Sequence, residues 1–202
     1  MGHYNQALNK KAISPVFPTY LNEANLNETA FALNKDYKFR KASLLDIPFV
    51  FEHVQDGSQR GSFTLKFMTS KGWVKLLNML ILDVLAPHRF FAKGGYDIKL
   101  LIFTLNKEDV GFMRIKYALT DKEVYEIDLC AIDQERRNQK IGSQMIRRFV
   151  EDLPSGAEIS AYCTIYSRAM QHILKKMKFK RDKKHSLNHA DHYRFTKPMH
   201  ME

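Results

Sequence analysis

The chain has 202 residues, a length that suits one domain and buries a sizeable core without disulfide or metal staples. Apolar residues make up 45% of it and charged residues 27%, which is ordinary for a soluble globular protein and argues against a disordered or fibrous chain. The 32 Lys and Arg residues outnumber the 22 Asp and Glu residues, and the resulting net charge of +10 predicts an anionic partner, whether a phosphate-rich cofactor, a nucleic acid or an acidic surface.

The cysteines and the apolar runs indicate where the protein resides. Cys130 and Cys163 both lie in apolar stretches, which favours buried thiols in a reducing compartment over a disulfide framework. The first residues, MGHYNQALNKKAISPVF, lack the apolar segment of a signal peptide. The longest apolar run, LLNMLILDVLA, contains Asn78 and Asp83 and is far shorter than the ~20 residues that span a bilayer. We therefore expect a cytoplasmic protein without a membrane span.

The composition changes near residue 37. Residues 1–36 are rich in Asn and Ala and contain Pro15 and Pro18, which interrupt regular structure. Compact hydrophobic patterns begin at Tyr37 and continue to the end of the chain. We expect an N-terminal extension over residues 1–36 and one domain over residues 37–202.

Hydrophobic periodicity predicts the elements of this domain in chain order. The expected elements are a strand over 37–43, a helix over 44–55, a loop over 56–62, a helix over 63–85 interrupted near Gly72, strands over 97–105, 109–119 and 123–132, a helix over 141–153, a strand over 157–166, a helix over 167–179 and a strand over 189–199. Asp46 and Ser167 are the expected N-caps of two of the helices. This order predicts a mixed α/β fold with a mostly antiparallel central sheet flanked by helices, rather than a doubly wound repeat.

A basic turn separates the strand VYEIDLCAI from the helix that follows it. The segment ERRNQKIGSQMIRRF, residues 135–149, has Arg136, Arg137 and Lys140 near its start and contains a single glycine, Gly142. Free backbone N–H groups and the helix dipole favour anions at a helix N-terminus, the three cations add charge, and Gly142 is expected to let a ligand approach the backbone. A solvated surface turn is the alternative explanation. Because neither GxxxxGK[ST] nor GxGxxG is present, a P-loop or Rossmann site is not predicted.

The segment EIDLCAIDQERRNQKIGSQMI resembles the central motif of the GNAT superfamily of N-acetyltransferases. In that family a strand carrying a glutamate leads into the pattern Arg/Gln-x-x-Gly-x-Gly/Ala at a helix start. Arg137 and Gly142 match the first and last positions of the pattern, and Lys140 takes the place of its first glycine. The expected element order from Tyr37 onward is also similar to that fold, so the resemblance covers about four-fifths of the chain.

The resemblance implies that acetyl-CoA is the co-substrate and that no metal is needed. Its pyrophosphate would bind at the helix start, which carries Arg137, Asn138, Gln139, Lys140, Ile141, Gly142 and Ser143. Its pantetheine arm would pair with the backbone of Cys130, Ala131 and Ile132, where this fourth strand splays from the fifth. Ser167 takes the place of a family asparagine. We expect Lys140 to adopt ordinary helical φ and ψ and to donate its N–H.

Acetylation of an amine requires that the ammonium group first lose a proton. Glu126 takes the place of the family's base, acting directly or through water, and Asp128, two residues along on the same face, is the second candidate. Proximity of the two could raise the pKa of one of them; alternatively, both face solvent or pair with Lys and Arg of a neighbouring strand. Leu174 stands where the family has a proton-donating tyrosine. Tyr162, Tyr166 or water would replace it, although both tyrosines are expected in the core or an interface.

The predicted function is transfer of the acetyl group of acetyl-CoA to a primary amine of an unidentified small molecule or protein, by a monomer or homodimer. One alternative is a catalytically weak CoA-binding regulatory module. The other is an acetyltransferase associated with nucleic acid or tRNA, which would use basic segments such as 175–185. A solvated helix end and strand edge explains that segment more simply.

Two other groups of residues have simple structural explanations. His185, His189 and His192 fall within eight residues, but on a hairpin we do not expect these spacings to converge on one metal ion. The aromatic residues near Trp73 lie where the family's helix pair walls the acceptor pocket, although aromatics at helical spacing are typical of a core.

Overall fold

The computed structural model describes residues 36–86, 88–89, 96–118, 123–186 and 189–199. The expected N-terminal extension, apart from Asp36, lies outside these residues and stays a prediction. The strands are β1 (Tyr37–Lys41), β2 (His88–Arg89), β3 (Tyr96–Leu105), β4 (Glu108–Ala118), β5 (Val124–Ile132), β6 (Glu158–Thr164), β7 (Lys180–Arg181) and β8 (Ala190–Thr196). The helices are α2 (Ile47–Gln59), α3 (Ser70–Leu85), α4 (Ile141–Asp152) and α5 (Arg168–Lys176), with 3-10 turns η1 (Leu44–Asp46), η2 (Leu65–Met68) and η3 (Gln134–Arg136).

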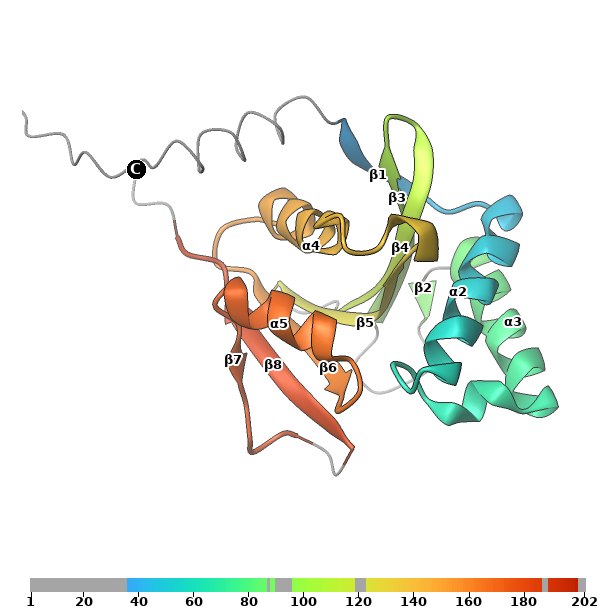
Figure 1. Ribbon diagram of the computed structural model, residues 1–202. Helices are drawn as coiled ribbons and strands as arrows, with labels where there is room; N and C mark the ends of the chain where they lie inside the picture. Colours follow the sequence, from blue (N-terminus) through green and yellow to red (C-terminus); the bar gives the residue numbers. More distant parts are fainter. Residues whose placement is uncertain (1–35, 87, 90–95, 119–122, 187–188, 200–202) are drawn as a thin grey trace, which may run out of the picture. The chain divides into compact units, whose positions relative to one another are not determined.

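These strands form one eight-stranded sheet in the order β1-β3-β4-β5-β6-β8-β7, with β2 paired to β3 (Figure 1). The pairing of β5 with β6 is parallel, and the other pairings are antiparallel. The predicted mixed, mostly antiparallel sheet flanked by helices is thus confirmed. Strands β3 and β4 form a hairpin that turns at Asn106 and Lys107, both at positive φ, as is typical of a two-residue turn.

Each face of the sheet carries its own hydrophobic core, because α4 and α5 pack on one face and α2 and α3 on the other (Figure 1). Strand β3 contributes side chains to both cores. Leu101 and Phe103 face the α4 and α5 core, whereas Leu100 and Ile102 face the α2 and α3 core. A strand buried on both sides reads as a continuous apolar run, which is the pattern of this segment. Within the described part of the chain, no helix has the length and hydrophobicity of a membrane span.

Two predicted helix boundaries are wrong. Helix α2 runs on to Gln59 through the expected loop, and the ring of Phe63 covers Gly57, where a Cβ atom would lie 2.4 Å from it. The expected helix over 63–85 is divided at Thr69 rather than near Gly72, because the Thr69 hydroxyl accepts a hydrogen bond from the Gly72 N–H at 3.0 Å and caps α3.

The two expected N-caps hold their positions but use their side chains differently. Asp46 makes no cap bond to α2; its carboxylate accepts hydrogen bonds from Ser43 and from Arg40 on β1. Ser167 makes no cap bond to α5 and instead donates its hydroxyl to the Ser62 carbonyl at 3.0 Å. Both side chains therefore connect their helices to other elements.

Candidate functional site

The two parallel strands separate halfway along their length. Strands β5 and β6 pair from Val124–Glu158 to Ile127–Ala161, and among the described residues no further pair joins them beyond Ile127. At the same point the register of β5 against β4 shifts, which leaves Asp128 as an extra, bulged residue. A β-bulge bends its strand, so the bulge accounts for the divergence of β5 from β6. The predicted splay between the fourth and fifth long strands is present.

The bulge also reverses which face the following side chains occupy. Ile127 packs in the α4 and α5 core, whereas Leu129, two residues later, packs in the opposite core. Without a bulge these two side chains would lie on the same face. As a result Cys130 and Ile132 face the α4 and α5 side. The end of β5 therefore directs its side chains toward the start of α4.

Helix α4 begins without a side-chain cap. Lys140 occupies the N-cap position with φ 61° and ψ 6°, which is left-handed rather than the ordinary helical conformation we expected. The first backbone hydrogen bond of the helix joins the Gln144 N–H to the Lys140 carbonyl at 3.2 Å. The N–H groups of Ile141, Gly142 and Ser143 precede that bond and have no partner within the helix.

Gly142 packs closely against two neighbouring elements and also lines the cavity described below. A Cβ atom at this position would lie 3.2 Å from Ile173 Cδ1 and 3.6 Å from Ile132 Cγ1. The glycine therefore allows the first turn of α4 to lie close to the end of β5 and to α5. The expectation that Gly142 also lets a ligand approach the backbone stays a prediction.

A cavity of about 650 Å³ lies where the strands separate and α4 begins. The predicted residues that line it are Asp128, Cys130, Ala131, Ile132, Arg137, Asn138, Lys140, Ile141, Gly142, Ser143 and Ser167. Glu126 and Gln139 do not line it, and the Gln139 side chain donates instead to the Glu135 carbonyl. The structure thus brings all but two of the predicted site residues to one cavity.

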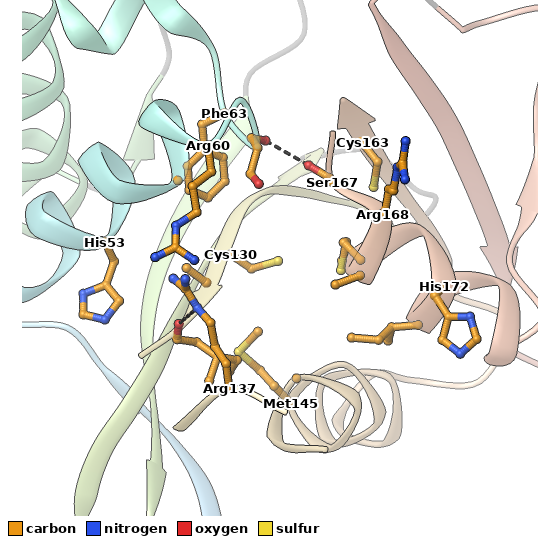
Figure 2. Close-up of a pocket in the computed structure, with 18 of the residues that line it drawn as sticks. His53, Arg60, Phe63, Cys130, Arg137, Met145, Cys163, Ser167, Arg168 and His172 are labelled. Carbon is orange, nitrogen blue, oxygen red and sulfur yellow. Dashed lines mark hydrogen bonds between the residues drawn. The ribbon is translucent and has the colours of Figure 1, made fainter. Parts of the chain in front are cut away.

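Among the charged residues of the cavity wall, cations outnumber carboxylates. Its cationic residues are Arg60, Arg136, Arg137, Lys140 and Arg168, against the carboxylates Asp56 and Asp128. Figure 2 shows Arg60 and Arg137 on one side of the cavity and Arg168 on the other. Such a distribution favours an anionic ligand.

Arg137 is held in place by two elements. It donates to the Asp56 carboxylate on α2 at 2.7 Å and to the Ile132 carbonyl at the end of β5 at 3.2 Å. Burial raises the pKa of Asp56, but the hydrogen bond from Arg137 and the charges of Arg137 and Arg60 outweigh it and hold that pKa below its usual value. Asp56 therefore stays ionised and fixes both arginines beside the cavity.

Another wall of the cavity is formed where the residues just after α2 contact the residues just before α5. The Thr164 hydroxyl donates to the Gly61 carbonyl at 2.8 Å. The Ser167 hydroxyl donates to the Ser62 carbonyl at 3.0 Å (Figure 2). The Tyr166 ring packs against Gly61 at positive φ, where a Cβ atom would lie 2.9 Å from the ring. Ser167 thus lines the cavity while it connects two elements.

The two candidate catalytic carboxylates lie in an ion-pair network. This agrees with the alternative that they pair with Lys and Arg of a neighbouring strand. Lys116 on β4 bonds Glu126 Oε1 at 3.0 Å and also Asp128, and Asp128 bonds Arg114 as well. The buried Arg114 contacts Asp83 of α3 at 2.6 Å. Burial opposes the charge of Lys116, but the charges and hydrogen bonds of Asp128 and Glu126 outweigh it and raise its pKa. Lys116 therefore stays protonated between the two carboxylates.

The tyrosines expected in the core lie at the cavity instead. Leu174 is fully buried, whereas Tyr162 and Tyr166 are 42% and 66% exposed and both line the cavity. Tyr162 directly follows Ala161, the last residue of β6 that pairs with β5. It is therefore the first side chain beyond the point where the strands separate.

The two cysteines line the cavity as neutral thiols. Cys163 is buried and Cys130 is partly buried. Burial raises the pKa of each thiol to about 12, so neither forms a reactive thiolate near neutral pH.

Sequence reasoning missed several wall residues that come from α2 and α5. They are His53 and Asp56 of α2, Arg60 at its C-cap, and Arg168 and His172 of α5. These residues belong to no local motif, and only the packing of α2 beside β5 and of α5 beside α4 brings them to the cavity. Phe63 also lines the cavity, and it belongs to the aromatic group with Phe67 and Trp73 that was expected near the acceptor pocket.

No family model matches the sequence, and no curated protein is significantly similar to it. Solved structures do match. An acetyltransferase from Thermus thermophilus is 17% identical, and the match covers 79% of this chain and 96% of that one with a TM-score of 0.57. A GNAT-family acetyltransferase from Streptococcus agalactiae 2603 is 14% identical, with 81% and 96% covered and a TM-score of 0.59. AAC(6')-Ib, solved with ribostamycin and coenzyme A, is 15% identical, with 80% and 93% covered and a TM-score of 0.59.

These likenesses establish the class of fold. The chain has the α/β fold of the GNAT acetyltransferases, with its cavity at the separation of β5 and β6. This confirms the fold that the basic turn and the element order predicted.

Proposed function

We propose that this protein is an acetyltransferase that binds acetyl-CoA in the cavity between β5, β6 and α4 and transfers the acetyl group to a primary amine. The observation that carries the proposal is the meeting of three features at one cavity. These are the separated strands, the α4 N-terminus without a side-chain cap and the five cationic wall residues. Structural neighbours solved with CoA, such as AAC(6')-Ib, support the choice of ligand.

Residues of the cavity suit two parts of acetyl-CoA, its pyrophosphate and its pantetheine arm. The N–H groups of Ile141, Gly142 and Ser143 together with the Lys140 side chain would hold the pyrophosphate. The backbone of β5 beyond Ile127 has no β6 partner among the described residues, so it would hydrogen-bond the amides of the pantetheine arm at Cys130–Ile132. Acetyl-CoA supplies an activated thioester, and the chain binds and orients it.

Glu126 is the proposed general base, acting through water. It contacts one cation, Lys116, whereas Asp128 contacts both Lys116 and Arg114. Because two cations hold Asp128 and only one holds Glu126, we assign the proton transfer to Glu126. Because Glu126 lies outside the cavity lining, a water molecule would carry the proton from the amine.

Tyr162 is the proposed proton donor to the departing CoA thiolate. Leu174 cannot donate a proton, and Tyr162 is the first residue of β6 beyond the pairing with β5. Its exposed ring lines the cavity where the thioester end of a ligand held by β5 would lie. Tyr166 is less suited, because its ring packs on Gly61.

The proposal is tested by following thiol release from acetyl-CoA in the presence of primary amines: an aminoglycoside, a polyamine and a peptide with a free N-terminus. We expect release that depends on both the protein and an amine. Loss of an acid or base costs roughly 10²–10⁴-fold, so Glu126→Gln and Tyr162→Phe should each lower kcat by about 100-fold with little change in KM for acetyl-CoA.

Glu123→Gln is the matched control for the base, because Glu123 is exposed and three residues away. It should keep the activity of the original protein. Acetyl-CoA binding without turnover on any amine would reject the enzyme and leave the CoA-binding module. An equal loss in the Glu123 and Glu126 variants would reject Glu126 as the base.

A further inference from the structure

The β7–β8 hairpin brings together three metal-ligating side chains outside the acetyl-CoA cavity. One donor atom from each of Asp182, His185 and His192 lies within 4.8 Å of the other two. The sequence singled out His185, His189 and His192 and predicted that they do not converge. The structure corrects that prediction, since two of these histidines, His185 and His192, meet at the carboxylate of Asp182.

A second, independent observation concerns the imidazole ring of His192, which has a nitrogen without a binding partner in the described part of the chain. Its ring is 7% exposed, and its Nδ1 atom is buried without a hydrogen-bond partner among the described residues. That nitrogen lies 3.7 Å from Asp182 Oδ2, which is too long for a hydrogen bond. A buried imidazole nitrogen without a partner is unfavourable, and a metal ion between the two atoms would satisfy it.

The hairpin positions these ligands with its own hydrogen bonds. The Asp182 N–H donates to the His192 carbonyl at 2.8 Å, which continues the pairing of β7 with β8. The Lys184 N–H donates to Asp182 Oδ1 at 3.1 Å, so Oδ2 is directed to the histidines. The Ser186 hydroxyl accepts from the His192 N–H and donates to the Asp182 carbonyl. Such supporting contacts are typical of metal ligands.

We propose that Asp182, His185 and His192 bind a divalent zinc ion. Two imidazoles and one carboxylate suit Zn²⁺, whose ligands at about 2.0–2.1 Å from the metal stand about 3.3 Å apart in a tetrahedron. The 3.7 Å between His192 Nδ1 and Asp182 Oδ2 is close to that spacing. His185 Nδ1 lies 2.7 Å from the same oxygen, so the ion would take the place of the proton between them, and the neutral imidazole would carry its single proton on Nε2.

The main competitor for Asp182 is Arg194. Its guanidinium lies 3.7 Å from Asp182 Oδ2, and it also pairs with Glu158 at 3.1 Å. The ion can therefore bind the Asp182 carboxylate, and Arg194 keeps Glu158 as its partner. Water completes the coordination, since three protein ligands leave one tetrahedral position open.

The proposed ion would stabilise a wall of the acetyl-CoA cavity from behind. The Tyr162 ring stacks on His192 with centroids 4.5 Å apart, and Tyr162 lines the cavity. Fixing His192 would therefore fix Tyr162. The zinc site itself does not depend on the acetyltransferase proposal.

The test uses the full chain, freed of metal by a chelator and then titrated calorimetrically with Zn²⁺. We expect one ion per chain and a rise in melting temperature on zinc addition. His185→Ala removes an exposed ligand without opening the core and should weaken zinc binding at least about tenfold. Co²⁺ in place of zinc should give the visible spectrum of tetrahedral coordination.

His189→Ala is the matched control, since His189 is an exposed histidine of the same hairpin outside the cluster. It should bind zinc within about twofold of the original chain. No stoichiometric binding, or binding weakened equally by the His185 and His189 variants, would overturn the site. Circular dichroism of each variant confirms that the fold is retained.

Discussion

Lys140 holds its backbone in the left-handed conformation, at a position where the GNAT pattern has a glycine. The φ of 61° brings a Cβ atom close to the following carbonyl, at a cost of roughly 1–2 kcal/mol. We expect Lys140→Gly to raise the free energy of unfolding by about 1 kcal/mol and the melting temperature by about 2–4 °C. Urea denaturation and a thermal melt measure the change.

Lys140→Ala separates backbone strain from loss of the lysine side chain. It truncates the same side chain but keeps a Cβ atom at positive φ, so it should be less stable than the glycine variant by about 1 kcal/mol. Equal stability of the two variants would show that Lys140 stores no strain. A lysine here would then be retained at no cost to the fold.

Asp46 shows how one residue joins two elements, β1 and the start of α2. Two hydrogen bonds from Arg40 lower its pKa from 3.8 to about 2, against the opposing effect of burial. Because the folded-state pKa is depressed, the stabilisation is complete above pH 3.8 and is lost as the pH falls toward 2. We expect Asp46→Asn to lower the free energy of unfolding by about 2 kcal/mol at about pH 7.

Urea denaturation across this pH range measures that effect, and the two proteins should become equally stable below about pH 2. Asp109→Asn is the control, because Asp109 pairs with the same arginine but is 35% exposed. An exposed pair contributes less than about 1 kcal/mol. A constant difference between the original and Asp46→Asn proteins over the whole range would mean that charge is not the cause.

At the level of elements, the sequence predicts what repeats along a strand or helix and misses what depends on register. The apolar runs of β3 and β4 predict two strands, and that prediction is confirmed. The continuation of α2 depends on Phe63 packing over Gly57, and the bulge at Asp128 depends on the pairing of β4 with β5. Neither contact leaves a periodic signal in the sequence.

The candidate site divides in the same way. The residues from Cys130 to Ser143 follow one another in the chain, so a single motif predicts the strand end and the helix start that line the cavity. Asp56 and Arg60 come from α2 and its C-terminal end, far earlier in the chain, so the sequence does not assign them to the cavity. The left-handed backbone conformation of Lys140 was not predicted, because the residue type lysine does not indicate a positive φ.

For the whole molecule, a net charge of +10 favours anions without choosing one. A general attraction would respond equally to the removal of any surface lysine, whereas a cavity for acetyl-CoA responds to residues at its wall. Lys140 and Lys107 distinguish the two cases. Both are exposed lysines at positive φ, but Lys140 begins α4 at the cavity and Lys107 lies in the β3–β4 turn.

The most direct test is a calorimetric titration of the full chain with acetyl-CoA, beside the variants Lys140→Glu and Lys107→Glu. We expect one molecule bound per chain, affinity reduced at least about tenfold by Lys140→Glu, and a change of less than about twofold in Lys107→Glu. Absence of binding to the original chain would contradict the proposed site. So would an equal loss in the two variants, which would reduce the binding to attraction by overall charge.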